Sequence, residues 1–346
     1  MRVALIAPPF IEVPPREYGG TELFIGHLAE ELQAQGVDVV LYSNGESSIG
    51  VENRWLFPHS QWPIKNQEHA QLKDLDHTSW AVKDAERDCD LIHLNAAQGL
   101  VCSRFTRKPI VYTIHHTGLE YLSQFYSRFP QVNYVCISGF QCEREPVPKK
   151  RTIHHGIRVS DYRMQARKQQ YLSFIGRIAP IKGTHLAIEI AKQSGVPLKI
   201  AGEIQPAFRE YFESKIKPQI DGKFIEYVGL ADLAAKNELL GNSLAMLFPI
   251  QWHEPFGLVM VEAMACGTPV LALRSGSVPE VVQDGVSGFV RGRAKELAKC
   301  VAQLPLPAEA VRAYVEERFS MQRMARDYIK LYSEVLESAR QEKSAA

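Results

Sequence analysis

The segment Glu254-Pro255-Phe256-Gly257-Leu258-Val259-Met260-Val261-Glu262 places two carboxylates around a Pro-Phe-Gly turn and the first turns of a predicted helix. A helix that starts after a glycine presents backbone N–H groups and the positive end of its dipole, so it suits a phosphate or a dense set of hydroxyls. An ionised carboxylate accepts hydrogen bonds from hydroxyls. A ligand with hydroxyls at both ends and phosphates between them, such as a nucleotide-sugar, matches this layout.

Glutamates at this spacing also occur on the solvated face of many amphipathic helices. The run that follows favours the binding interpretation. Residues 267–273, Gly-Thr-Pro-Val-Leu-Ala-Leu, read as a tight turn into a buried strand. The helix is then a crossover in a parallel sheet, and its N-terminus lies at the edge where such sheets bind ligands.

The run from Glu254 to Val270 resembles, nearly letter for letter, the Glu-x7-Glu element of the retaining glycosyltransferases of family 4, which have the GT-B fold. The further matches are Tyr18-Gly19-Gly20-Thr21-Glu22, Gly176-Arg177 with Lys182-Gly183, and the runs 276–282 and 284–290. The resemblance covers almost the whole chain. It implies an α/β protein in which two doubly wound, Rossmann-like domains face an interdomain cleft.

Composition agrees with an ordinary globular protein. The 346 residues predict two domains, and 45% hydrophobic with 23% charged residues is typical of such chains. The 40 basic and 39 acidic residues give a net charge of +1, which argues against nucleic acid as the main partner. No apolar run reaches the roughly 18–20 residues that span a bilayer.

The N-terminal run and the cysteines both bear on the cellular compartment. The run Met1–Pro9 is too soon broken by prolines for a signal peptide and reads as a first strand. Six scattered cysteines form no C-x-x-C pair, so neither a zinc site nor a redox motif is supported. We therefore expect reduced thiols and a cytoplasmic protein.

Short apolar runs alternate with helical stretches, which is the pattern of βα units around a parallel sheet. The predicted strands are 3–7, 37–42, 90–94, 110–115, 134–138 and 152–155 in the first half, and 171–175, 198–201, 225–228, 245–249 and 270–273 in the second. A helix is expected over 21–35. The domains are predicted at 1–155 and 156–320, and the resemblance implies that a last helix, at about 321–341, returns to the first domain. The segment 51–87 is uninterpreted: its aromatics either cover the sheet or face the acceptor.

Two basic residues are candidates for a diphosphate site. Arg177 follows the strand 171–175, and Lys182 comes five residues later at a predicted helix start. Both are expected at the carboxyl edge of the second sheet, where arginine offers a fork and lysine a point charge to phosphate oxygens. Taken alone, they also fit two solvated surface cations. The resemblance implies that they stabilise the departing nucleoside diphosphate without a metal.

The remaining candidates lie at loop and strand ends. Gly19 and Gly20 allow close backbone approach to a ligand, or form an ordinary loop tip. His115 ends the strand 110–115, and Glu203 ends the strand 198–201. Each also fits a satisfied histidine or a capping carboxylate. The resemblance implies that the glycines contact the donor, that His115 lines the sugar pocket and that Glu203 lies near the nucleotide. Relatives often have Asp where this chain has His116.

The resemblance implies retaining transfer of a hexose, and we expect UDP-glucose as the favoured donor and a hydroxyl of a small soluble molecule as the acceptor. The resemblance implies that Glu262 binds the ribose and Glu254 the transferred sugar, with Phe256, Gly257 and Leu258 at the donor. No metal, no cofactor and no membrane association are expected. The alternatives are a catalytically silent nucleotide-sugar-binding module and a GT-B epimerase. A nicotinamide-dependent dehydrogenase is disfavoured because Ala7-Pro8-Pro9-Phe10 stands where a G-x-G-x-x-G turn belongs. The acceptor, the donor's identity and the oligomeric state are not predicted.

Overall fold

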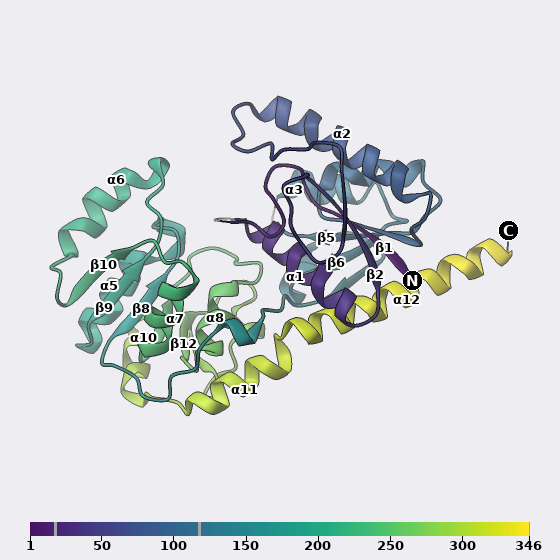
Figure 1. The fold of residues 1–346 in the computed structure, drawn as a ribbon. Coiled ribbons are helices and arrows are strands. Elements are labelled where there is room, and N and C mark those ends of the chain that lie inside the picture. Colours follow the sequence, from purple (N-terminus) through teal and green to yellow (C-terminus); the bar gives the residue numbers. More distant parts are fainter. Residues whose placement is uncertain (17–18, 117–118, 346) are drawn as a thin grey trace. The chain divides into compact units, whose positions relative to one another are not determined.

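The chain forms two compact units, each with its own parallel sheet. The computed structural model describes residues 1–16, 19–116 and 119–345. Unit 1 comprises Met1–Gly156 together with Met321–Ala346, and unit 2 comprises Ile157–Ser320. Every strand pair in both sheets is parallel, and helices lie between most successive strands (Figure 1). The predicted α/β class with two doubly wound domains is confirmed.

Unit 1 holds a seven-stranded sheet in the order β3-β2-β1-β4-β5-β6-β7. Its strands are β1 (Arg2–Ile6), β2 (Asp38–Ser43), β3 (Glu52–Trp55), β4 (Leu91–Leu94), β5 (Ile110–Ile114), β6 (Asn133–Cys136) and β7 (Lys150–Thr152). Its helices are α1 (Gly20–Ala34), α2 (Gln67–Ala85), the 3₁₀ segment η1 (Ala97–Arg104), α3 (Glu120–Tyr126), α4 (Gly139–Arg144) and α12 (Met321–Ala345).

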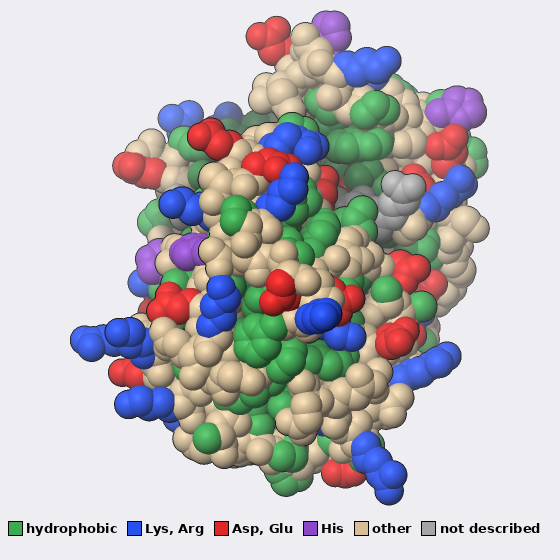
Figure 2. Space-filling model, turned by 90° about the vertical axis from the view of Figure 1, so that its left-hand side faces the viewer, with side chains coloured by type: hydrophobic (Ala, Val, Ile, Leu, Met, Phe, Trp, Pro, Cys, Tyr) green, Lys and Arg blue, Asp and Glu red, His purple; other side chains and the backbone are tan. Residues whose placement is uncertain are grey.

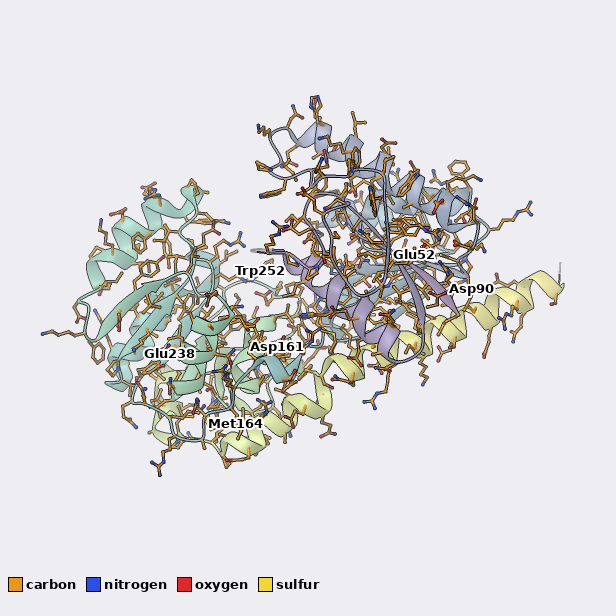
Figure 3. The ribbon with its side chains drawn as sticks, in the orientation of Figure 1. Glu52, Asp90, Asp161, Met164, Glu238 and Trp252 are labelled. Atoms are coloured by element: carbon orange, nitrogen blue, oxygen red, sulfur yellow. The ribbon has the colours of Figure 1, made fainter. Side chains whose placement is uncertain are left out.

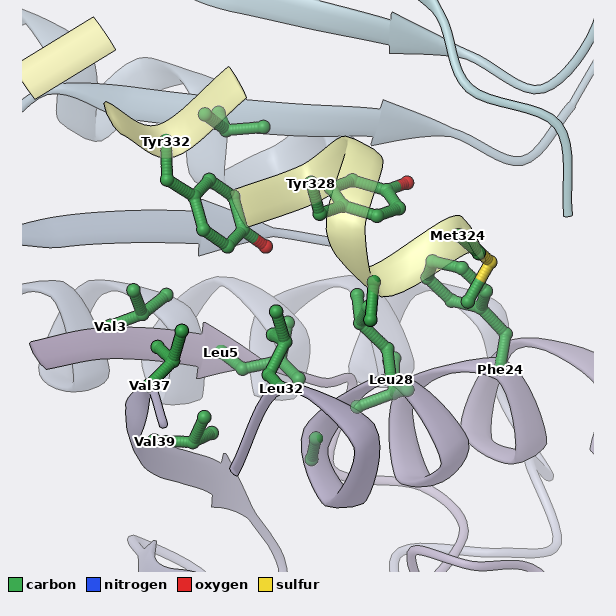
Figure 4. Close-up of a cluster of buried hydrophobic side chains, with 14 of the residues drawn as sticks. Val3, Leu5, Phe24, Leu28, Leu32, Val37, Val39, Met324, Tyr328 and Tyr332 are labelled. Atoms are coloured by element: carbon green, nitrogen blue, oxygen red, sulfur yellow. The ribbon is translucent and has the colours of Figure 1, made fainter. Parts of the chain in front are cut away.

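Side-chain alternation along β1 divides the core of unit 1 into two layers. Val3 and Leu5 point to the layer that contains α1 and α12, whereas Ala4 and Ile6 point to the opposite layer. This alternation is expected because successive side chains of a strand face opposite sides of the sheet. Figure 4 shows the first layer, with Leu28 and Leu32 of α1 beside β1.

The helix α12 joins this layer although it follows unit 2 in the sequence. Its tyrosines Tyr328 and Tyr332 are fully buried (Figure 4). Tyr332 contacts His93 Nδ1 at 2.7 Å, and His93 Nε2 lies 2.8 Å from the hydroxyl of Thr113, which contacts the Tyr328 hydroxyl at 2.9 Å. These hydrogen bonds satisfy the buried polar groups of β4, β5 and α12 together. His93 is therefore a core residue.

The segment 51–87 contains two elements that the sequence did not reveal, β3 and α2. In α2, His77 is buried, and the Trp80 ring lies 5.8 Å from that of Tyr42 on β2. These aromatics cover the sheet. Trp55 and Trp62 instead remain about half exposed, with 47% and 59% of their surface accessible.

Unit 2 holds a six-stranded sheet in the order β10-β9-β8-β11-β12-β13. Its strands are β8 (Leu172–Ile175), β9 (Leu198–Ala201), β10 (Ile225–Gly229), β11 (Ala245–Phe248), β12 (Val270–Leu273) and β13 (Gly288–Arg291). Its helices are α5 (Thr184–Ser194), α6 (Arg209–Tyr211), α7 (Leu233–Asn242), α8 (Leu258–Ala265), α9 (Val278–Val281), α10 (Ala294–Cys300) and α11 (Ala308–Arg318). Shorter turns are η2 (Val159–Asp161), η3 (Pro180–Lys182), η4 (Pro206–Phe208), the π-helical η5 (Phe212–Ile216), η6 (Lys217–Gln219) and η7 (Val301–Gln303).

One predicted strand is misplaced. The prediction of 152–155 is wrong, because β7 covers Lys150–Thr152. Ile153 and His155 are buried and suggest an inward-facing strand, but the ladder with β6 ends at Thr152. The strand β13 was not predicted at all.

The surface agrees with the balanced composition. On the face in Figure 2, basic and acidic side chains are interspersed. No helix among the described residues is long and apolar enough to cross a membrane.

Candidate functional site

The carboxyl ends of three neighbouring strands in unit 2 carry the predicted polar residues. β8, β9 and β11 are parallel, and β8 pairs with both of the others. Arg177 follows β8, Glu203 follows β9, and Glu254 lies in the loop after β11. Because the ends of parallel strands meet at one edge, the three residues lie at the same edge of the unit-2 sheet.

The backbone around Glu254 is fixed by the loop after β12. The N–H of Ser277 donates to the carbonyl of Glu254 at 3.0 Å, and the Ser275 hydroxyl donates to the carbonyl of Trp252 at 2.7 Å. Gly276 has φ 56°, and a Cβ there would lie 2.3 Å from the Glu254 carbonyl oxygen. Only glycine allows this approach, so the two loops hold each other in place.

The Glu254 side chain is 10% exposed and has two donors on one oxygen. Its Oε2 accepts from Lys182 Nζ at 2.6 Å and from the indole Nε1 of Trp252 at 2.9 Å. The Lys182 ammonium also lies 5.1 Å from the centroid of the Trp252 ring. The predicted sugar-binding carboxylate and the predicted phosphate-binding lysine are thus brought into direct contact.

Lys182 is placed by a constrained turn. It ends η3, and Gly183 follows with φ 75° as the residue before α5. A Cβ on Gly183 would lie 2.0 Å from the carbonyl oxygen of Pro249. The N–H of Gln251 donates to Ile181 at 2.8 Å. The loops after β8 and β11 are therefore joined beside the Lys182–Glu254 pair.

Glu262 lies in α8 and is paired with a lysine of α7. Both of its carboxylate oxygens accept from Lys236 Nζ, at 3.1 and 3.0 Å. The Glu262 side chain is 10% exposed and that of Lys236 is 29% exposed. Burial, followed by the charge of Glu262, raises the pKa of the Tyr162 hydroxyl, which places Tyr162 beside this carboxylate.

The start of α8 lies between the two glutamates in the sequence. Gly257 precedes the helix with φ 82°, and Leu258 is its first residue. The Phe256 side chain is 1% exposed and packs against Phe319, with ring centroids 5.8 Å apart. Phe256 therefore anchors the turn in the core.

Arg177 and Lys182 have different hydrogen-bond partners. It is exposed, and its Nη1 donates to Gln205 at 3.3 Å. The Gln205 amide donates to Glu203 at 3.0 Å. Arg177 and Glu203 are thus linked through Gln205, whereas Lys182 belongs to the Glu254 cluster. No hydrogen bond joins these two groups among the described residues.

In unit 1, His115 follows β5 and contacts Asn95, which follows β4. The Asn95 amide nitrogen donates to the Ile6 carbonyl at 3.1 Å, so its Oδ1 faces His115 Nε2 at 3.0 Å. Burial, then the neighbouring histidines, hold the pKa of His115 well below its usual value. A neutral ring that donates through Nε2 has an acceptor lone pair on Nδ1.

Gly19 and Gly20 lie at the start of α1. A Cβ on Gly19 would lie 2.9 Å from Oε2 of Glu22 and 3.0 Å from Pro15, so this glycine is closely covered. Around Gly20 there is open space. Burial raises the pKa of Glu22. Tyr18, the first residue of the quoted motif, lies outside the described residues.

The described residues contain no group of three or more His, Cys, Asp or Glu side chains arranged to hold a metal ion. The six cysteines are free thiols.

Sequence reasoning missed four residues of these clusters: Trp252, Lys236, Tyr162 and Asn95. Trp252 is only two residues before Glu254, so its nearness to the motif is a signal that the sequence offers. Lys236 and Tyr162 reach Glu262 from segments that lie 26 and 100 positions earlier in the sequence. Nothing local in the sequence predicts those contacts.

Comparisons with known proteins agree with this division of the chain. Residues 163–317 match the family model described as Glycosyl transferases group 1, and residues 18–135 match the one described as Glycosyltransferase Family 4. The first match lies in unit 2 and the second in unit 1.

Curated relatives share modest identity. D-inositol 3-phosphate glycosyltransferase of Segniliparus rotundus is 27% identical over 68% of this chain, and the match spans 53% of that protein. N-acetyl-alpha-D-glucosaminyl L-malate synthase of Bacillus anthracis is 35% identical over 32% of this chain and 30% of its own length. The chain thus spans about half or less of these two relatives.

Solved structures share the fold over nearly the whole chain. Sucrose-phosphate synthase from Thermosynechococcus elongatus matches with a TM-score of 0.79, 20% identity and full coverage of both chains. Anabaena HepE in complex with UDP-glucose matches with a TM-score of 0.72 and 19% identity, over 96% of this chain and all of the other. These likenesses establish the GT-B fold.

Proposed function

We propose that this chain, whose family matches and fold support a GT4-type glycosyltransferase, moves a hexose from a nucleotide-sugar to a hydroxyl of a small acceptor with retention of configuration. The observation that carries the proposal is the contact of Lys182 with Glu254 at 2.6 Å, one residue cluster that offers both a cation for phosphate and a carboxylate for sugar hydroxyls. The start of α8 follows Glu254 directly, and Glu262 lies within that helix.

The donor roles follow from the family resemblance and agree with the chemistry of each group. Glu262 accepts hydrogen bonds from the vicinal hydroxyls of the ribose, and Glu254 accepts from hydroxyls of the transferred sugar. Lys182 and Arg177 neutralise the diphosphate. The assignment of Gly19, Gly20 and His115 to the donor remains a prediction. UDP-glucose is the leading donor, and the fold shared with an Anabaena protein solved with UDP-glucose supports that choice.

Transfer breaks the bond between the anomeric carbon and the donor phosphate oxygen, and forms a bond from that carbon to the acceptor oxygen. The acceptor proton passes to the departing phosphate. A double displacement needs a carboxylate nucleophile beneath the anomeric carbon, whereas Glu254 is assigned to hydroxyls of the transferred sugar. We therefore favour attack on the same face from which the diphosphate leaves, with Lys182 and Arg177 holding its charge.

We also propose that no metal ion is required, because these two cations supply the charge that Mg²⁺ or Mn²⁺ provides in other transferases. The test is turnover in excess EDTA. Unchanged turnover supports the proposal, whereas activity abolished by EDTA and restored by Mn²⁺ overturns it.

The acceptor is proposed to be a small soluble molecule. Two relatives are described as acting on D-inositol 3-phosphate and on L-malate, which are both small anions. These two compounds therefore head an acceptor screen for this chain.

The first experiment is a binding screen with UDP-, GDP- and ADP-glucose, followed by acceptor screening with the donor that binds. Release of free nucleoside diphosphate distinguishes transfer from a silent binding module and from an epimerase. NMR of the anomeric proton in the first product then tests the stereochemistry: an α-linked product from an α-donor supports retention, and a β-linked product refutes it. Glu254→Gln serves as the inactive control.

A further inference from the structure

Trp252 occupies a position that the proposed roles of Glu254 and Lys182 leave unexplained. It lies in the loop after β11 and is labelled in Figure 3. Its indole N–H donates to Glu254 Oε2, the same oxygen that Lys182 contacts. Its ring lies beneath the Lys182 ammonium. One side chain therefore contacts both members of the pair.

The carboxylate of Glu254 is oriented by these two donors. With Oε2 occupied twice, Oε1 is left to accept from a ligand, because no hydrogen bond to Oε1 occurs among the described residues. An ionised carboxylate that accepts from fixed donors keeps a defined plane. The direction in which Oε1 is presented thus depends on Trp252 and Lys182 together.

The two donors differ in what a diphosphate does to them. An ammonium has three protons on a flexible stem and is drawn toward phosphate oxygens, which carry more charge than one carboxylate. The indole N–H has a single proton and no attraction of that kind. Once Lys182 turns to a diphosphate, Trp252 is the donor that still holds Glu254.

The backbone of Trp252 is built to keep that geometry. Its carbonyl accepts from the Ser275 hydroxyl at 2.7 Å and from the N–H of Glu254 at 3.0 Å. Gly276 closes against Glu254 from the same loop. The indole therefore projects from a segment that is held against the loop after β12.

We infer that Trp252 is a positioning residue for the donor sugar: it orients the Glu254 carboxylate and lets Lys182 serve the diphosphate without loss of that orientation. The inference rests on the proposed function. It separates two parts of the donor, since Trp252 supports the contact with the sugar and not the contact with the nucleoside diphosphate.

The experiment compares the wild type with Trp252→Phe, which keeps an aromatic ring under Lys182 but has no N–H. Affinities for UDP and for UDP-glucose are measured by calorimetry, or for the other nucleoside diphosphate and its glucose derivative if the screen selects them. We expect UDP-glucose to bind about tenfold more weakly to the variant, the change produced by loss of a charge-assisted hydrogen bond. UDP affinity should stay within about twofold, which also shows that the variant is folded.

Fluorescence gives a second readout. The chain has tryptophans at positions 55, 62, 80 and 252, and Trp252 is the one that falls in unit 2. Addition of UDP-glucose should change the emission of the wild type and of the control Trp62→Phe, whose side chain is 59% exposed in the native protein. The change should disappear in Trp252→Phe.

The outcomes separate the two claims. A wild type that binds no UDP-, GDP- or ADP-glucose overturns the proposed function, and the inference with it. A wild type that binds, with a Trp252→Phe variant of equal affinity for UDP-glucose, overturns the inference alone. An equal loss of affinity for UDP and UDP-glucose also overturns it, because Trp252 would then support the site as a whole rather than the sugar.

Discussion

The replacement of Glu262 by alanine should separate nucleotide binding from stability. In the native protein this carboxylate holds Lys236 through both oxygens. Bound ribose hydroxyls would add charge-assisted hydrogen bonds to the same group, worth roughly 1.5–3 kcal/mol. Loss of that contribution weakens UDP binding by roughly 10- to 150-fold at 1.4 kcal/mol per tenfold.

The stability effect should be smaller than the effect on binding. Lys236 is 29% exposed, so after Glu262→Ala its ammonium turns to water, and the pair costs at most about 1 kcal/mol. The reverse change, Lys236→Met, leaves a carboxylate that is 10% exposed without its cation and should destabilise by about 1–3 kcal/mol. Glu262→Ala should therefore be the more impaired variant in UDP binding, and Lys236→Met the more impaired variant in the free energy of unfolding.

The assay is calorimetric titration with UDP, paired with urea unfolding. Glu238→Ala, which removes an exposed carboxylate of α7, is the matched control and should match the wild type in both. Equal UDP affinity in the wild type and Glu262→Ala would refute the assignment of the ribose to this residue.

Three further predictions concern the sugar contact, the turn at Lys182 and the pH dependence. Glu254→Gln should lose more turnover than UDP affinity, and a parallel loss of both would place this residue at the nucleotide instead. Gly183→Ala should lower the melting temperature more than Gly195→Ala: both have positive φ, a cost of about 1 kcal/mol for alanine, but a Cβ on Gly183 would also meet the Pro249 carbonyl at 2.0 Å, whereas none lies within 4 Å of one on Gly195. Equal decreases in melting temperature would mean that the Pro249 loop moves to accommodate the added Cβ. Burial lowers the pKa of His93 to about 3 from its ordinary 6.5. Below about pH 6.5 the unfolded state therefore binds a proton that the folded state does not. The free energy of unfolding then decreases by about 1.4 kcal/mol for each unit by which the pH is lowered. Urea unfolding at pH 7 and 5.5 should show a smaller fall in His93→Gln, and identical falls would contradict this.

Local pattern predicted most of the fold because parallel strands buried on both faces read as short apolar runs. The bounds of β9 and β12 agree with the prediction to the residue. β3 was not predicted because its Glu-Asn-Arg-Trp sequence is polar. The strand lies at the edge of the sheet, where Arg54 forms ion pairs with Asp84 and Asp88. β13 was not predicted because it begins with Gly288, and a glycine does not indicate a strand. The structure requires glycine here, since a Cβ would lie 2.0 Å from the Val270 carbonyl.

The candidate site was predictable where the chemistry is local. Glu254 and Glu262 stand in one motif, and strand ends located Lys182, Arg177 and Glu203. The partners that decide how these groups behave come from elsewhere. Lys236 reaches Glu262 only because α7 and α8 pack together, and Asn95 reaches His115 because β4 and β5 are neighbours. Such contacts depend on tertiary structure rather than on spacing.

The most direct test of the account is a crystal structure of the chain with UDP-glucose or the nucleotide-sugar that the screen selects. We predict ribose hydroxyls within hydrogen-bond distance of Glu262, sugar hydroxyls at Oε1 of Glu254 and a diphosphate oxygen at Lys182. A nucleotide bound in unit 1 alone, or one whose sugar lies at Glu262, would contradict it.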